Sequence, residues 1–358
     1  MRGRLRMLNG RPEGKGLPPG QARLAEGLRG PPRRFQVDRP QPGTGIPSCL
    51  TGTRSQRLLL DEKTRCPQPA AMLLLHDPRC AEYGSYGHPE QPARVTKTAA
   101  RLRACGASWV WGAVAGSVPE ETLLLAHTPA HLARLEEPHD FDPDTPYFPD
   151  IAVHARRSVA AALAAAGHAH ASREPAFALM RPPGHHATAD RAMGFCYMNQ
   201  VAIAALAARR DFGAERVAIW DFDAHHCNGT EAILFGREGF LVCSVHQAAG
   251  YPGTGLHHSD NSLNWALPPQ TPRVQHMEAL RSSLDEVASF RPDLLLVSAG
   301  FDAYARDPIT EMSLEVEDFA LMGRWLHETG LPAAAILEGG YSPDLPMLVE
   351  AFLKAWAA

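Results

Sequence analysis

From Ala71 onward, the chain alternates short apolar runs with longer segments in which Ala, Leu, Glu and Arg recur at helical spacing. Alternation of this kind predicts a parallel sheet with helices on both faces. No repeat or internal linker interrupts it, so we expect a single α/β domain with a central, mostly parallel sheet. The expected strands are 72–75, 176–180, 217–220, 240–245, 294–298 and 333–337, and the expected helices are 153–171, 194–210, 273–290, 315–329 and 343–356.

Residues 1–70 differ in composition from the rest. They carry 14 Lys and Arg against 5 Asp and Glu, whereas the remaining chain has 21 against 34. Ten Gly, ten Pro and no sustained apolar period predict a disordered extension, with the catalytic domain in 71–358. A basic arm for an anionic partner, a transit peptide and an over-extended start near Met72 all remain open. The transit peptide is disfavoured because the segment has only two Ser.

Overall composition excludes several classes of protein. A net charge of −4 gives no global basic field, so we expect no direct nucleic-acid binding. No apolar run approaches the roughly 20 residues of a membrane span, and there is no signal peptide, so we expect a soluble, cytoplasmic protein without membrane contact. Seven Cys with no C-x-x-C pair favour reduced thiols. Oligomeric state stays open.

Polar or glycine-rich motifs follow five of the expected strands. In an open parallel sheet, ligands bind in the crevice beyond the carboxyl ends of the strands. We therefore expect five loops to converge on one rim. These loops are 181–186, 221–229, 246–255, 300–302 and 338–341.

The densest motif is Asp-Phe-Asp-Ala-His-His-Cys-Asn-Gly-Thr at 221–230. If extended backbone continues past the strand, Asp221, Asp223 and His225 share one face. Asp223 and His225 could then bind one cation, with Asp302 as third ligand. Three protein ligands and one open position are typical of a catalytic zinc site. A lone Asp would more simply cap a helix, but two Asp and two His within six residues favour a metal.

Two further loops carry groups suited to hydrolysis. His185 and His186 lie in a Pro- and Gly-rich loop, and an imidazole there could take a proton from water and return it to a leaving amine. Tyr341 follows Gly339 and Gly340, and its hydroxyl could donate to an oxyanion. Alone, the His pair could equally be a bystander, and Tyr341 could be an ordinary turn residue.

Together these motifs resemble the zinc-dependent histone deacetylase family, in particular the bacterial histone-deacetylase-like amidohydrolases, which have the arginase–deacetylase fold. The resemblance extends from about His76 to Tyr341. It is carried by HPEQPAR at 88–94, RPPGHHA at 181–187, GFCYMN at 194–199, the motif at 221–230, YPGTG at 251–255, SAGFDA at 298–303 and LEGGY at 337–341.

The resemblance implies a role for each matching residue. One zinc ion would be bound by Asp223, His225 and Asp302. His186 would be the general base, His185 its electrostatic or general-acid partner, and Tyr341 the group that polarises the acetyl carbonyl. Asp221 would support His185, and Asn228 would support His186. A narrow substrate tunnel would be lined by Gly194, Phe195 and Tyr251, with Ile309 at its mouth. A potassium ion would be bound by Asp221, Asp223, His225, Ser244 and Val245.

The sequence departs from the family pattern at two positions. Cys227 replaces a usual Gly, which alters loop packing without removing a ligand. Asn228 replaces the Asp of some relatives, so a protonated His186 is supported less strongly. Polyamine-preferring relatives can also place a Glu after an Asp-Pro pair, whereas here Asp307-Pro308 is followed by Ile309, as in lysine-directed members. Glu311 and the acidic segment 140–144 remain alternative sources of negative charge at the mouth.

The predicted function is therefore a zinc-dependent amidohydrolase acting on acetyl-lysine in proteins. An acetylpolyamine or other small acetylated amine is the alternative substrate. An arginase-like enzyme would need D-x-H-x-D for two manganese ions, and position 227 is Cys instead of Asp. A non-catalytic acetyl-lysine-binding protein should have lost a ligand, the base or the tyrosine, and all are present.

Overall fold

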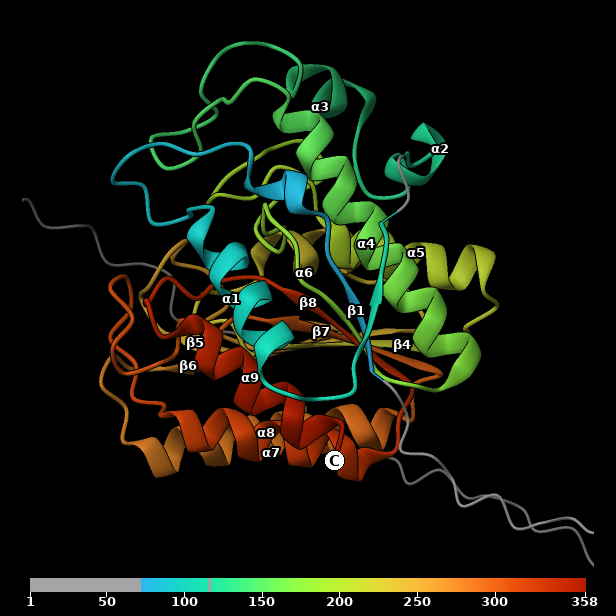
Figure 1. Cartoon of the computed structure of the whole chain (residues 1–358). Coiled ribbons are helices and arrows are strands. Elements are labelled where there is room, and N and C mark those ends of the chain that lie inside the picture. Colours follow the sequence, from blue (N-terminus) through green and yellow to red (C-terminus); the bar gives the residue numbers. More distant parts are fainter. Residues whose placement is uncertain (1–71, 115–116) are drawn as a thin grey trace, which may run out of the picture. The chain divides into compact units, whose positions relative to one another are not determined.

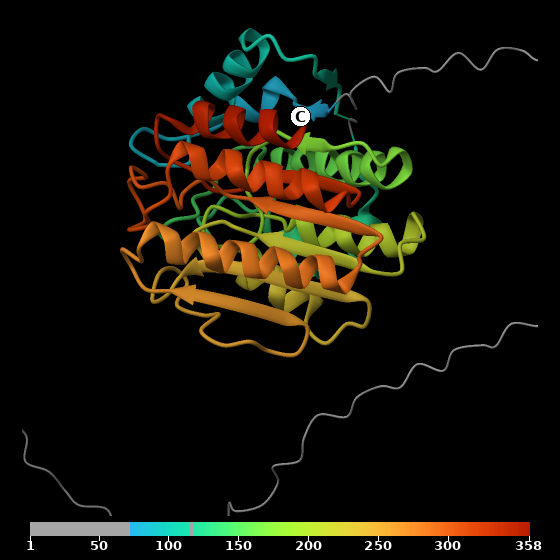
Figure 2. The same ribbon diagram turned by 90° about the horizontal axis from the view of Figure 1, so that it is seen from below.

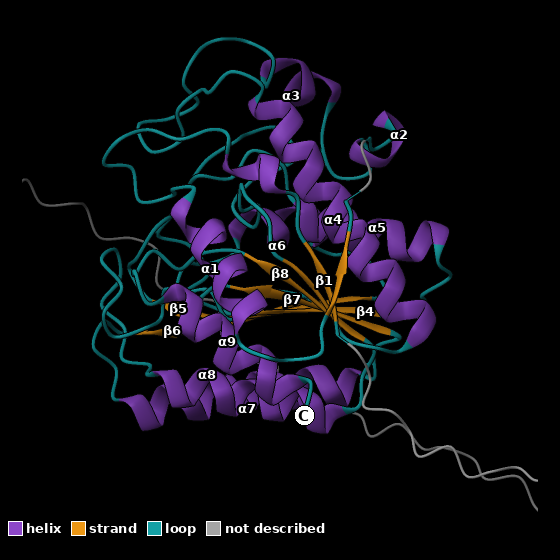
Figure 3. Ribbon diagram, viewed as in Figure 1, coloured by secondary structure: helices purple, strands orange, loops and turns teal. Residues whose placement is uncertain are grey.

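The central sheet of this computed structural model contains eight parallel strands in the order β2-β1-β3-β8-β7-β4-β5-β6 (Figures 1 and 3). The structure describes residues 72–114 and 117–358, so the predictions for the segment 1–70 lie outside it. The strands are β1 (Leu73–Leu75), β2 (Val110–Gly112), β3 (Ala176–Ala178), β4 (Val217–Asp221), β5 (Phe240–Gln247), β6 (Ser262–Leu267), β7 (Leu294–Ala299) and β8 (Ala333–Leu337).

Helices cover both faces of the sheet, which confirms the predicted fold class. On one face lie α1 (Ala93–Ala104), α7 (Arg273–Phe290), α8 (Val316–Thr329) and α9 (Leu345–Trp356), and Figure 2, which views the molecule from below, shows the last three side by side. The opposite face carries α4 (Ile151–Ser172), α5 (Gln200–Asp211) and α6 (Asn228–Leu234). The short elements are η1 (Pro78–Ala81), α2 (Glu120–Leu123) and α3 (Pro129–Arg134). None of the described helices is long and apolar enough to cross a membrane.

Burial on both faces explains why the central strands were readable as continuous apolar runs. Every residue of β4, β7 and β8 is buried, as is usual in parallel sheets with helices on each side. The two strands that the sequence analysis missed, β2 and β6, lie at the sheet edges. Both are partly exposed and need fewer apolar side chains.

The helix predicted at 194–210 begins later than expected. Its first residue is Gln200, because the Asn199 side chain accepts a hydrogen bond from the Ala202 amide at 2.8 Å and caps the helix. Gly194 and Phe195 before it have φ angles of 58° and 67°, which a helix does not allow. The freed residues 194–199 form a loop at the same edge of the sheet as the other motifs.

All strands point the same way, so their carboxyl ends lie on one side of the molecule (Figure 2). The loops after β3, β4, β5, β7 and β8 leave from that side. The expected convergence of five loops on one rim therefore follows from the common direction of the strands.

Candidate active site

Two carboxylates and one imidazole meet at the centre of this rim. Asp223 and His225 come from the loop after β4, and Asp302 from the loop after β7. Their ligand atoms all lie within 4.8 Å of one another. His225 Nδ1 is 3.1 Å from Asp223 Oδ1 and 2.9 Å from Asp302 Oδ2. Strand β4 ends at Asp221, so the expectation that extended backbone places these residues on one face is wrong; a bend after Asp221 brings Asp223 and His225 together.

Backbone amides hold the two carboxylates in place. Gly339 N donates to Asp223 Oδ2 at 2.7 Å, and Ala224 N donates to Asp302 Oδ1 at 2.8 Å. A Cβ at Gly339 would lie 2.3 Å from Asp302 Oδ2, and one at Gly300 only 2.1 Å from Asp223 Oδ2. Both positions therefore need glycine for the loops to approach the carboxylates this closely.

The donor set fits a divalent cation. Asp223 and Asp302 are fully buried, and like charges this close are unfavourable without a cation between them. Burial would lower the pKa of His225, but the carboxylates of Asp302 and Asp223 outweigh it and raise that pKa well above its usual value. One imidazole and two carboxylates, with His225 reaching the cavity described below, form a group that could hold a catalytic metal ion.

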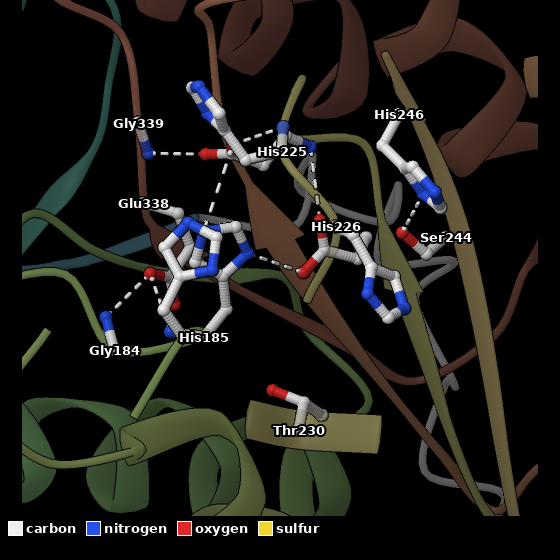
Figure 4. Close-up of polar contacts among 12 residues, drawn as sticks. Gly184, His185, His225, His226, Thr230, Ser244, His246, Glu338 and Gly339 are labelled. Atoms are coloured by element: carbon white, nitrogen blue, oxygen red, sulfur yellow. Dashed lines mark hydrogen bonds and ion pairs between the residues drawn. The ribbon is translucent and has the colours of Figure 1, made fainter. Parts of the chain in front are cut away.

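A second group of ligand-type side chains, His185, Cys196 and Glu338, is better explained without a metal. Glu338 Oε2 already accepts hydrogen bonds from Gly184 N at 2.7 Å and His185 N at 3.2 Å (Figure 4). Burial raises the pKa of the Cys196 thiol well above its usual value, which disfavours the thiolate that a metal requires.

The two adjacent histidines have different partners. His185 Nδ1 lies 3.2 Å from Asp221 Oδ2, and His186 Nδ1 lies 2.7 Å from Asn228 Oδ1. Since the Asn228 oxygen only accepts, His186 carries its proton on Nδ1 and leaves Nε2 free to act as a base. Asp221 is an ionisable partner instead, so His185 can hold a full positive charge.

The surroundings of the histidines push their pKa values apart. Burial opposes protonation of His185, but Asp223 and Asp221 raise its pKa to about 10. Burial, together with His185 and His225, lowers the pKa of His186 well below its usual value. Such a divergence is the usual sign of separate acid and base roles. A cation bound at Asp223 would weaken the electrostatic attraction between the Asp223 carboxylate and His185. Asp221 would then be the main anionic partner of His185.

A cavity of about 270 Å³ opens onto this cluster. All four residues assigned to the tunnel line it, and Phe195 packs edge-on against Tyr341 with ring centroids 5.6 Å apart. A Cβ at Gly194 would lie 2.6 Å from the His186 ring, so glycine is needed beside the base. The lining residues are Pro89, Asp144, His186, Gly194, Phe195, His225, Tyr251, Ile309 and Tyr341.

Of the two acidic alternatives for the mouth, only the segment 140–144 contributes to the lining. Asp144 is exposed there, and its backbone oxygen is 3.2 Å from His88 Nε2. Glu311 instead accepts from Gln270 Nε2 at 3.2 Å and is absent from the lining residues.

Sequence reasoning assigned no role to three residues that touch the catalytic loops. Arg94 Nε donates to Gly340 O at 2.7 Å, and its guanidinium lies 4.7 Å from the Tyr341 ring centre. Glu338 supports the His185 loop, and burial raises its pKa to about 7. Asp307 binds the Tyr341 backbone, and burial and Asp302 raise its pKa to about 7. All three lie in recognisable motifs, but the sequence does not show which loop each contacts.

Fold and site define a class: an α/β hydrolase in which the candidate metal ligand His225, the candidate base His186 and Tyr341 line one cavity. The histone deacetylase domain family model matches residues 88–356. A probable deacetylase from Methanothermobacter thermautotrophicus is 37% identical over 293 residues, which are 76% of this chain and 86% of that protein. The chain belongs to the histone deacetylase family, and the predicted hydrolase class is confirmed.

Solved structures agree with this assignment. The HD domain of HDA15 superposes with a TM-score of 0.75 and 28% identity, covering 80% of this chain and 90% of that one. An acetylpolyamine aminohydrolase from Burkholderia pseudomallei gives a TM-score of 0.71 and 26% identity, covering 80% of this chain and 99% of that one. These neighbours confirm the arginase–deacetylase fold.

Proposed function

We propose that this deacetylase is zinc-dependent and that it removes the acetyl group from acetyl-lysine in proteins. The observation that supports this best is the shared cavity, which His186, His225 and Tyr341 all line. We also propose residues 71–358 as the catalytic domain, with the extension 1–70 and the cytoplasmic location kept as predictions.

When bound by Asp223, His225 and Asp302, zinc supplies a Lewis acid that acidifies water and polarises a carbonyl. His186 Nε2 takes the proton of the attacking water, since its Nδ1 is engaged by Asn228. The Tyr341 hydroxyl donates to the oxyanion that develops on the acetyl oxygen. His185 is held by Asp221, and its ring lies 4.0 Å from that of His186, measured between ring centroids. Its positive charge disfavours a protonated His186 and so promotes transfer of the proton from His186 to the departing amine as the C–N bond breaks and acetate is released.

The mouth of the cavity has an apolar residue, Ile309, which can contact a neutral alkyl chain, and an acidic residue, Asp144, which can attract a cation. Ile309 is 37% exposed there and presents an apolar surface, which favours the lysine-directed assignment. Asp144, also at the mouth, gives an acetylated polyamine a second ammonium site. Because one structural neighbour is an acetylpolyamine aminohydrolase, we keep this substrate as the second candidate.

The decisive experiment is to compare kcat/KM of the purified, zinc-loaded protein on acetyl-lysine peptides and on acetylated polyamines side by side. A higher value on the peptides supports the first proposal, and a higher value on the polyamines supports the second. No turnover of any acetylated amine would contradict both.

Ile309→Glu should shift this preference towards polyamines. A carboxylate at the mouth would attract the distal ammonium of an acetylated polyamine. We expect the ratio of kcat/KM on acetylated polyamines to kcat/KM on acetyl-lysine peptides to rise about tenfold, which corresponds to about 1.4 kcal/mol. Ile309→Gln is the matched neutral control and should change the ratio little. An equal shift in both variants would show that charge is not the cause.

Tyr341→Phe should lower kcat by about 10²–10³, as expected for loss of an oxyanion donor. Metal content and KM should stay near wild type because the phenol ring and its packing against Phe195 remain. Steady-state kinetics with metal analysis measures both quantities. Near-normal turnover would refute the role of Tyr341.

We further propose that a potassium ion lies beside Asp221, Asp223, His225, Ser244 and Val245. Ser244 pairs with Asp221 in the β4–β5 register, and Figure 4 shows it next to His246. His246 Nε2 donates to Gly255 O at 3.0 Å, and burial, helped by His226, lowers the pKa of His246 to about 3. Its neutral Nδ1 therefore accepts the Ser244 hydroxyl proton at 2.8 Å, so the Ser244 oxygen keeps lone pairs for a cation. Thermal stability in potassium against choline chloride tests this proposal.

A further inference from the structure

One carboxylate joins the mouth of the cavity to the loop that carries the catalytic tyrosine. Asp307 lies between β7 and α8 and is only 7% exposed. Its Oδ1 accepts from Ile309 N at 3.1 Å. Its Oδ2 accepts from Tyr341 N at 2.7 Å and from Ser342 N at 3.2 Å. Asp307 therefore contacts two residues that line the cavity, Ile309 and Tyr341, through their backbones.

The Tyr341 ring packs against Phe195 and Arg94, but the other side-chain hydrogen bonds to the backbone at 338–341 all act upstream of Tyr341. Gly339 is held through Asp223, and the Gly340 carbonyl through Arg94. Gly340 has a φ of 112°, a conformation that L-residues rarely adopt and that glycine leaves flexible. The direction in which Tyr341 leaves this turn thus depends on what holds its own amide, and that acceptor is Asp307.

We propose that Asp307 is a positioning residue that orients the Tyr341 hydroxyl toward the acetyl carbonyl and fixes its position relative to Ile309 at the mouth. This inference rests on the proposed function, in which Tyr341 donates to the oxyanion. A displacement of about 1 Å in such a donor can cost about 10² in rate. Asp307 does not touch the substrate itself; it acts through the tyrosine.

A double-mutant cycle distinguishes this role from simple structural support. Asp307→Ala should lower kcat about 10–100-fold with KM changed less than about threefold. Asp307→Asn should lose less, because its single amide oxygen can still accept from the Tyr341 and Ser342 amides. In the Tyr341→Phe background, where no hydroxyl remains to be aimed, both substitutions should change kcat less than about threefold. Equal losses in the two backgrounds would overturn the proposal, as would wild-type kcat in Asp307→Ala.

Asp293 offers a matched control at the other end of β7. Its Oδ2 also accepts two backbone amides, from Glu215 and Arg216, each at 2.8 Å. Asp293→Ala removes the same kind of contact but should leave kcat unchanged. A comparable loss of kcat in this variant would show that the effect of Asp307→Ala comes from removing any such backbone contact and not from the position of Tyr341.

Hydrogen exchange separates this inference from the proposed function. Exchange of the Tyr341 and Ser342 amides should be about tenfold or more faster in Asp307→Ala than in wild type, and unchanged in Asp293→Ala. If the wild-type protein hydrolyses no acetylated amine, the proposed function fails, and exchange alone decides whether Asp307 holds the loop. Unchanged exchange at these two amides would refute the contact.

Discussion

Asp302→Ala is expected to release the metal and abolish turnover. Asp302 is fully buried and faces His225 Nδ1 at 2.9 Å, and it is one of the three protein ligands in the proposed metal site. Losing a hydrogen-bonded neighbour of a ligand already costs about 10–100-fold in metal affinity, and losing a ligand should cost more. Metal content after dialysis, measured by elemental analysis, should fall below about one tenth of wild type.

Asp302→Asn keeps the shape of the side chain and controls for misfolding. Burial and the neighbouring Asp223 raise the pKa of Asp302, which shows that its charge is unfavourable in the metal-free site. The metal-free Asn variant should therefore be at least as stable as metal-free wild type. Zinc should raise the thermal midpoint of the wild type but much less that of the variant. Full metal occupancy in Asp302→Ala would refute the ligand assignment.

The central strands were predictable because each is marked by a short run of consecutive apolar residues in the sequence. Strands buried on both faces must be apolar throughout, and β4, β7 and β8 satisfy this requirement in consecutive residues. Strand β6, with only β5 beside it, contains Ser262 and Asn264 and has no such signature. Edge strands are therefore the part of this sheet that a pattern of apolar runs cannot show.

The site was predictable to the level of loops but not of contacts. Each motif follows a strand, and a parallel sheet brings all strand ends to one edge, so proximity of Asp223 and Asp302 could be expected. Asp307 and Tyr341 are 34 residues apart, and their contact depends on how two loops turn after their strands. The bend after Asp221 is similarly set by bonds from distant elements, including Ala224 N to Asp302. The spacing of residues along the sequence therefore does not predict how these loops turn.

The sheet also explains why the chemistry is concentrated in a small space. Strands β4 and β7 are neighbours, as are β7 and β8, so the loops with Asp223, Asp302 and Gly339 leave from adjacent positions. Glycine at 300 and 339 then lets backbone lie against the carboxylates. The resulting site is buried, which strengthens every charge interaction in it and accounts for the opposed pKa shifts of His185 and His186.

His186→Ala should keep the metal and lose most of the turnover. The imidazole lines the cavity, and Asn228 orients it with Nε2 free, so its removal takes away the proton acceptor for the attacking water. General-base catalysis contributes about 10²–10⁴ in rate, and kcat should fall by that factor. KM should change little because Phe195, Tyr251 and Ile309 still line the cavity.

Three measurements make this prediction specific to proton transfer. Metal content should equal that of wild type, since Asp223, His225 and Asp302 are untouched. Added imidazole should restore part of the turnover, because the substitution leaves room for a small base beside the cavity. Asn228→Ala should show a smaller loss than His186→Ala, since it removes only the group that orients the base. Near-normal kcat in His186→Ala, or a loss explained by missing metal, would show that another group accepts the proton.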